Sequence, residues 1–298
     1  MDAASQATQP LCQNAPRLDQ GKDAMRDQEM TAPEQDIDVW LAVEDEIDEA
    51  ARAGFGALMT AAEREQQQRF RFDHDRSRYL ITRGMVRTVL SQYADIAPAD
   101  WTFECNDYGR PHIAPRHGEA CALSFNISHS RGLIALAVAR HRALGVDVEQ
   151  LTQRPVSMDI AQRYFAPVEV ADLARVPQAG QQDRFFEYWT LKESYIKARG
   201  MGLSIPLDQF AFHYPHEHAV QLTVDPALGD DAGRWRFWQC RPTPDHLLAL
   251  CAEQGEGPAP TVRFHRLMAP TARARLELTF LRTSGGSHHG LEASNPEA

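Results

Sequence analysis

Lysine is scarce in this chain of 298 residues. Of its 31 basic residues only Lys22, Lys192 and Lys197 are lysines, so arginine supplies nearly all of the positive charge. The two side chains differ chemically, because only the ammonium group is a compact donor whose pKa can be tuned for proton transfer. Two of the three lysines stand close together, at 192 and 197, which favours a role for them in a functional site.

Cysteine is also rare, and long apolar runs are missing. The cysteines are Cys12, Cys105, Cys121, Cys240 and Cys251, and no two of them form a CxxC pair. This usage favours a reduced cytoplasm over a disulfide framework or a zinc site. No apolar run approaches the roughly 20 residues that a membrane-spanning helix needs, and the N-terminus lacks the pattern of a secretory signal. We expect a cytoplasmic protein that does not bind a membrane.

A basic excess is absent as well, since the net charge is −10. The first 50 residues hold 13 acidic and 3 basic side chains, so this segment carries the whole imbalance. A general nucleic-acid-binding protein usually shows the opposite charge. We interpret residues 1–36 as a disordered acidic leader and residues 268–298 as a C-terminal extension that is flexible at its end.

The order of predicted elements indicates the fold class. Alternating apolar residues predict a half-buried strand at 37–43. Helices are predicted at 60–72, 75–93, 157–165 and 182–199, and further strands at 121–127, 132–139, 143–149, 208–214, 218–224, 234–240 and 246–252. Short breaks near 130 and 141 predict antiparallel hairpins. Since helices followed by strands occur twice, we expect an α+β fold of two similar halves, 37–145 and 146–267.

Residues 145–149 (GVDVE) place two acids on one strand face. Alternate residues of a strand point to the same side, so Asp147 and Glu149 lie together and Val146 and Val148 point into a core. Adjacent carboxylates repel each other unless a cation lies between them, and hard oxygen ligands favour Mg²⁺ or Mn²⁺. Taken alone, the pattern fits two solvent-facing acids on an edge strand better than a metal site.

Residues 189–197 (WTLKESYIK) read as part of a helix. Glu193 and Lys197 are four residues apart and share a helix face. On its own this spacing is typical of a surface ion pair, worth little to stability. The scarcity of lysine gives it more weight.

Residues 124–130 (SFNISHS) form a strand end that carries hydroxyl groups and an imidazole. Such groups, with exposed backbone N–H groups, suit a phosphate. The same pattern also fits a turn that closes a hairpin. Taken together, the carboxylates, the lysine and this segment are the components of phosphoryl transfer: metal, cation and positioning groups.

Residues 125–130, 145–149 and 189–198, in this order and spacing, resemble the three signature blocks of the 4′-phosphopantetheinyl transferases. The monomeric, surfactin-type branch fits best, and the resemblance covers roughly residues 37–252. The family implies two similar halves, each a small, mainly antiparallel sheet packed with helices, with the active site between them.

The resemblance also implies a function and roles for individual residues. The 4′-phosphopantetheine arm of coenzyme A would pass to a serine of an apo acyl or peptidyl carrier protein, releasing 3′,5′-ADP. Asp147, Glu149 and Glu193 would bind Mg²⁺, with Mn²⁺ as a substitute, and Glu193 and Lys197 would act in catalysis. Coenzyme A would contact the side chains of Arg78, Arg110, Ser128, His129, Lys192 and Lys197. Where relatives often carry lysines that hold the 3′-phosphate, this chain has residues 63–66 (EREQ), so Arg64 or Arg69 would substitute.

Two other functions use the same residues. A Mg²⁺-dependent phosphohydrolase acting on coenzyme A or a nucleotide would use the same carboxylates with water as the nucleophile. A non-catalytic protein that binds carriers or coenzyme A would not need Asp147, Glu149, Glu193 and Lys197, and their presence disfavours that alternative.

Overall fold

The computed structural model describes residues 36–152 and 158–285. It has two principal sheets, and the predicted α+β class is confirmed. Most of the interpreted leader and the end of the C-terminal extension lie outside the described residues. Within the described ranges no helix is both long and apolar enough to cross a membrane.

The first sheet has five strands in the order β12-β11-β1-β5-β4. Their bounds are Ala272–Leu276, Val262–Ala269, Ile37–Val43, Leu133–Arg140 and Leu123–Ser130. Strand β1 runs parallel to β11, and the other pairs are antiparallel. A short ribbon of β2 (Phe103–Cys105) and β3 (Pro111–Ile113) precedes β4 in the chain.

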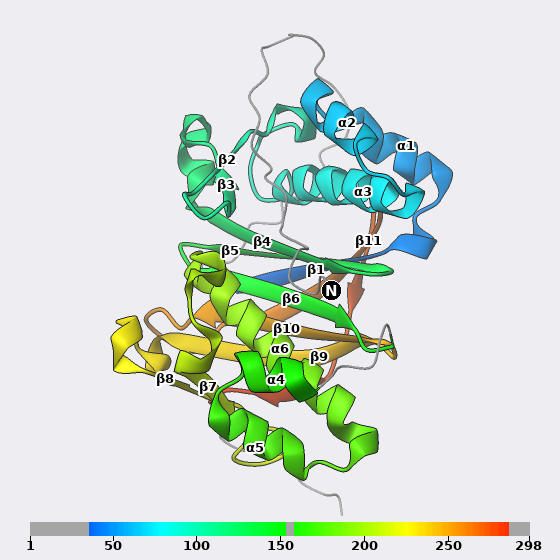
Figure 1. Cartoon of the computed structure of the whole chain (residues 1–298). Coiled ribbons are helices and arrows are strands. Elements are labelled where there is room, and N and C mark those ends of the chain that lie inside the picture. The colour runs from blue at the N-terminus through cyan, green and yellow to red at the C-terminus, as the bar shows by residue number, and fades with distance from the viewer. Residues whose placement is uncertain (1–35, 153–157, 286–298) are drawn as a thin grey trace, which may run out of the picture.

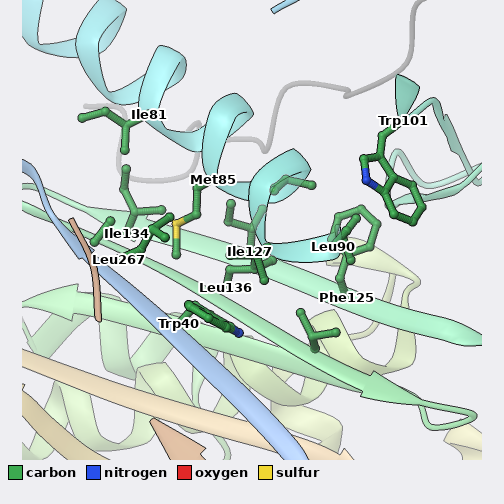
Figure 2. Packing of buried hydrophobic residues seen from close by; sticks show 14 of the residues in the cluster. Trp40, Ile81, Met85, Leu90, Trp101, Phe125, Ile127, Ile134, Leu136 and Leu267 are labelled. Carbon is green, nitrogen blue, oxygen red and sulfur yellow. The ribbon is translucent and has the colours of Figure 1, made fainter. Parts of the chain in front are cut away.

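Helices α1 (Glu49–Ala57) and α3 (Asp73–Leu90) cover the outer face of this sheet, and α2 (Ala61–Gln68) packs on α3 (Figure 1). Figure 2 shows Ile81, Met85 and Leu90 of α3 packed on Trp40, Ile127 and Leu136 of the strands. A capping box between Thr60 and Glu63 begins α2.

The second sheet has the order β13-β9-β10-β6, with the bounds Phe280–Thr283, Trp235–Thr243, His246–Glu253 and Leu144–Gln150. Helices α4 (Met158–Tyr164), α5 (Pro167–Arg175) and α6 (Gln178–Arg199) pack on its outer face (Figure 1). A ribbon of β7 (Phe210–His213) and β8 (Gln221–Val224) completes this half.

The two sheets face each other through an apolar layer. Odd-numbered residues of β1 and β5 meet Val146 and Val148 of β6 and Leu248 and Leu250 of β10 there. Even-numbered residues of β1 and β5 point the other way, toward α3. Strand β1 is therefore buried on both faces, which corrects the expected half-buried strand.

The joint between the sheets corrects a second expectation. Strands β4 and β5 form the predicted hairpin, but β6 belongs to the other sheet and pairs with β10. In place of a strand partner on its free edge, β6 binds side chains of β4. The backbone N–H groups of Val146, Val148 and Gln150 donate to the side-chain oxygens of Asn126, Ser128 and Ser130, at 2.8, 3.3 and 2.9 Å. We call these three β4 side chains the polar ladder.

The chain boundaries of the halves also need correction. Strands β11 and β12 join the sheet of the first half, although 146–267 and 268–298 were assigned to the second half and an extension. Strand β13 joins the second sheet, so the segment up to Thr283 is structured. Helices α1 and α5 and strands β2, β3 and β11–β13 are additions to the predicted elements.

Candidate active site

Strand β6 and helix α6 approach each other closely at Gly145. A Cβ atom at this position would lie 2.1 Å from the Ser194 backbone oxygen and 2.4 Å from the Ala198 nitrogen. Only glycine permits such contact between a strand and a helix backbone. The glycine of the GVDVE segment therefore sets how near its two acids lie to the residues of α6.

Asp147 of β6 and Lys197 of α6 form an ion pair across this contact. The Lys197 ammonium donates to Asp147 Oδ1 at 2.6 Å and to Ser128 Oγ at 2.9 Å. The Ser128 hydroxyl in turn donates to Asp147 Oδ1 at 2.9 Å. The structure thus brings residues of all three sequence segments into one hydrogen-bonded cluster, which draws on both halves.

Ser128 has no hydrogen-bonding capacity left in this arrangement. A hydroxyl offers one donor and two acceptor positions. The donor goes to Asp147, and the acceptors take the Lys197 ammonium and the Val148 N–H group. The structure places Ser128 where it orients Asp147 and Lys197; its expected contact with coenzyme A stays a prediction.

Negative charge exceeds positive charge in the cluster. Burial, followed by the charge of Asp147, raises the pKa of both Glu149 and Glu193. Burial alone would lower the pKa of Lys197, but Asp147 and Glu193 outweigh it and raise this pKa. Three carboxyl groups therefore share one ammonium group, an arrangement that favours a further cation.

One observation supports a divalent cation in this cluster, and another limits that interpretation. The buried Oδ2 atom of Asp147 has no hydrogen-bond partner among the described residues. Carboxylate oxygens suit Mg²⁺, so Asp147, Glu149 and Glu193 fit this ion by charge and chemistry. In the described part of the chain, however, no three acidic, histidine or cysteine side chains converge into a formed metal centre.

His129 lies on the first-half side of the cluster. Burial lowers its pKa to about 4, and the charges of Arg78 and Lys197 act in the same direction. The imidazole is therefore neutral at physiological pH. Its Nδ1 atom is buried and has no partner among the described residues. Arg78 of α3 is held by Glu44, with 2.6 Å between Arg78 Nε and Glu44 Oε1.

The position of Lys192 differs from the expected contact with coenzyme A, because its side chain cannot reach a ligand in this site. Its side chain is fully buried, and Nζ lies 2.8 Å from Glu169 Oε2. The same ammonium donates to the backbone oxygens of Leu207 and Phe210, both at 2.7 Å. Its three N–H donors are thus used inside the second half, so Lys192 is a structural residue and not a contact for coenzyme A.

Arg110 also has a role that differs from the expected one. Its guanidinium donates to backbone oxygens of Lys197, Ala198 and Leu144. The expected contact between Arg110 and a phosphate therefore competes with three hydrogen bonds inside the protein.

Sequence reasoning missed the polar ladder as a unit. Asn126, Ser128 and Ser130 alternate along one strand, so they share a face. The sequence indicates a strand end that suits a phosphate or a turn that closes a hairpin, and the structure uses the polar face of this segment to join the two sheets. The alternation of polar and apolar residues in FNISHS is the signal that could have shown it.

Comparisons with known proteins agree with this arrangement. Residues 40–141 match the model of the 4′-phosphopantetheinyl transferase N-terminal domain, and residues 143–251 match that of the 4′-phosphopantetheinyl transferase superfamily. The junction between the two matches falls between β5 and β6, where the chain passes from one sheet to the other.

Several curated relatives are similar over most of their length. The Sfp transferase of Bacillus subtilis is 31% identical over 204 residues, covering 68% of this chain and 86% of the relative. Another 4′-phosphopantetheinyl transferase of Bacillus subtilis is 37% identical over 168 residues, covering 56% and 72%. HetI of a Nostoc species is 32% identical, covering 67% and 81%. With the clustered signature residues, these matches place the chain in the 4′-phosphopantetheinyl transferase superfamily, on its Sfp-like branch.

Proposed function

We propose that this enzyme transfers the 4′-phosphopantetheine arm of coenzyme A to a serine of an apo carrier protein. The observation that carries the proposal is the cluster of Ser128, Asp147 and Lys197, in which both halves meet around a surplus of carboxylates. This arrangement suits a substrate with a negatively charged pyrophosphate, bound together with a divalent cation.

The proposed reaction is a displacement at phosphorus. The hydroxyl oxygen of the carrier serine forms a bond to the phosphorus on the pantetheine side, and the bond to the 3′,5′-ADP oxygen breaks. Glu193 accepts the serine proton, directly or through water. Lys197 stabilises the charge on the departing phosphate, a position supported by its exposure of 20% beside Asp147. Such preorganised charges supply a large part of catalysis in phosphoryl transfer.

We assign Asp147, Glu149 and Glu193 as the groups that would hold Mg²⁺. When bound, this ion neutralises pyrophosphate charge and polarises the phosphorus for attack. The contacts of His129 and Arg78 with coenzyme A remain proposals, supported by the place of His129 near both Arg78 and Lys197. Action as a cytoplasmic monomer is proposed as well, and size-exclusion chromatography with light scattering would check the monomer.

The test is incubation of the protein with an apo carrier, coenzyme A and Mg²⁺, followed by intact-mass measurement of the carrier. We expect the carrier to gain one phosphopantetheine group, and the D147N variant to lose this activity. The matched control is D183N, which changes an exposed acid of α6, the helix that carries Lys197. Asp183 forms an ion pair with Arg241 and lies near the N-terminal end of α6, whereas Lys197 lies near its C-terminal end.

The assay also distinguishes the other functions. Cleavage of coenzyme A without a carrier would indicate a phosphohydrolase instead. If the protein binds both acyl and peptidyl carriers but the mass of neither carrier increases, the protein is non-catalytic. Normal transfer by D147N would refute the assigned role of Asp147.

A further inference from the structure

The C-terminal end of α6 carries the two residues proposed to act in catalysis. Glu193 and Lys197 lie in its last two turns, and the helix ends at Arg199. The last carbonyl groups of any helix lack partners within the helix. Gly200 follows with φ of 68° and donates its N–H group to the oxygens of Ile196 and Lys197. The remaining carbonyls of this end need partners from elsewhere.

The turn between β2 and β3, in the first half, supplies partners for the Ala198 and Gly200 carbonyls and a further donor for the Lys197 carbonyl. Arg110 Nη1 donates to the backbone oxygens of Lys197 and Ala198, the latter at 3.0 Å. Asn106 Nδ2 donates to the Gly200 oxygen at 2.8 Å. We call Asn106 and Arg110 the α6 clamp.

The clamp also holds the strand that carries Asp147. Arg110 Nη2 donates to the Leu144 oxygen at 2.8 Å, at the first residue of β6. One planar guanidinium therefore binds the end of α6 and the start of β6. Because the five donors of arginine have a fixed geometry, these contacts set the position of one backbone relative to the other.

Hydrogen bonds within the turn between β2 and β3 hold the base of the clamp. Asn106 Oδ1 accepts the backbone N–H groups of Tyr108 and Arg110, at 3.0 and 2.9 Å. Gly109 in the same turn has φ of 82°, a conformation that favours glycine. The turn is thus closed by its own bonds, and Arg110 projects from a fixed base.

We propose that Asn106 and Arg110 are positioning residues that align Lys197 with Asp147 by binding backbone carbonyls. This inference rests on the proposed function for its kinetic readout. It differs from the role expected from sequence, in which Arg110 holds a phosphate. The two roles make opposite predictions for lysine at this position, because lysine binds a phosphate as a point charge but cannot span three carbonyls.

The test compares R110A, R110K and N106A with wild type in steady-state transfer. We expect all three to lower kcat, the arginine variants by about 10- to 100-fold, since small misplacements of reacting groups have effects of this size. The KM for coenzyme A should stay near the wild-type value. R116A is the control, because Arg116 is an exposed arginine that follows the same hairpin and, among the described residues, donates to the Asp100 oxygen alone.

A second measurement does not depend on activity. Hydrogen exchange of the amides at residues 196–201 should accelerate in R110A, R110K and N106A and not in R116A. If the wild type transfers no phosphopantetheine, the proposed function fails, and this exchange measurement still decides on the clamp. Unchanged exchange, with R110K active and R110A raising the KM for coenzyme A, would overturn the inference and assign Arg110 to a phosphate.

Discussion

At the scale of single residues, the side chains that the sequence marks as functional fall into two groups: those in the Asp147 cluster and those buried elsewhere. Ser128 and Lys197 bond directly to Asp147, whereas Lys192, five residues from Lys197, lies among apolar side chains with Glu169. Lysine scarcity marks both lysines equally. What separates them is the face of α6 on which each lies, because a spacing of five residues turns the side chain away from its predecessor.

Replacing Ser128 by alanine should affect both stability and catalysis. The Val148 N–H group would lose its partner while still buried, at a cost of about 1–3 kcal/mol, and Lys197 would lose one of its two acceptors. We expect a lower free energy of unfolding in urea and a lower kcat. The control is S124A, at the half-buried start of the same strand; equal behaviour of the two variants would contradict the role given to Ser128.

Replacing Lys192 by methionine should destabilise the fold by about 3–5 kcal/mol, because a buried Glu169 would remain without its counter-charge. The double variant K192M/E169Q should recover part of this loss, since it removes the second charge as well. Urea unfolding of the single and double variants measures both effects. A raised KM for coenzyme A in K192M, with unchanged stability, would restore the role that the sequence suggested.

At the scale of elements, the site depends on how β6 and α6 pack. Gly145 brings their backbones together. The polar ladder joins β4 to the edge of β6 that does not pair with β10. Strand β6 is therefore fixed on three sides: by β10, by α6 and by β4 side chains. This explains how two carboxylates on one strand can be kept close despite their repulsion.

The G145A variant should lose activity and stability together. The added methyl group would meet backbone atoms of α6, which have no rotamer to relieve the clash, and overpacking of this kind costs about 1–3 kcal/mol or more. Transfer assays and thermal unfolding would measure the loss. G56A is the control, since its added methyl would only reach ordinary contact with Leu80, at 3.4 Å. Wild-type transfer by G145A would show that α6 can move without consequence.

Elements with strong periodicity are the ones that the sequence predicts well. Strands β4, β5 and β6 and helices α3 and α6 lie close to their predicted ranges, since each has a clear apolar face. Helix α1 was missed because Gly54 and Gly56 weaken its helical signal, yet glycine helps this region pack: Gly84 of α3 meets Phe55 of α1 with no room for a Cβ atom. Pattern alone also cannot show which sheet a strand joins, as with β6 and β11.

At the scale of the whole molecule, the two ends of the described chain meet in one buried network. Asp38 of β1 accepts hydrogen bonds from Arg263 and His265 of β11 and from Tyr93, in the turn that follows α3. Burial alone would raise the pKa of the Asp38 carboxyl, but the hydrogen bonds from His265, Arg263 and Tyr93 outweigh it and lower the pKa. The ionised carboxylate is thus part of what joins β1 to β11.

This pairing predicts a dependence of stability on pH. A lowered pKa in the folded state stabilises the protein above the unfolded-state value of about 3.9, and the contribution disappears as pH falls through the folded-state pKa. We expect D38N to be less stable than wild type by about 3–5 kcal/mol at neutral pH, with the difference shrinking below about pH 4. Urea titrations across this range measure it, with D183N as an exposed control. A difference that is constant with pH would exclude the carboxylate as its source.

The place of β11 beside β1 has a consequence for synthesis on the ribosome. Asp38 of β1 and Arg263 of β11 are 225 positions apart. At ordinary translation rates β1 therefore emerges from the ribosome roughly ten to forty-five seconds before β11. Throughout that interval the nascent first half carries an open strand edge, the kind of surface that recruits other chains. The sheet of the first half can be completed only after β11 has been translated. A premature stop codon before Val262 would leave the edge of β1 permanently exposed.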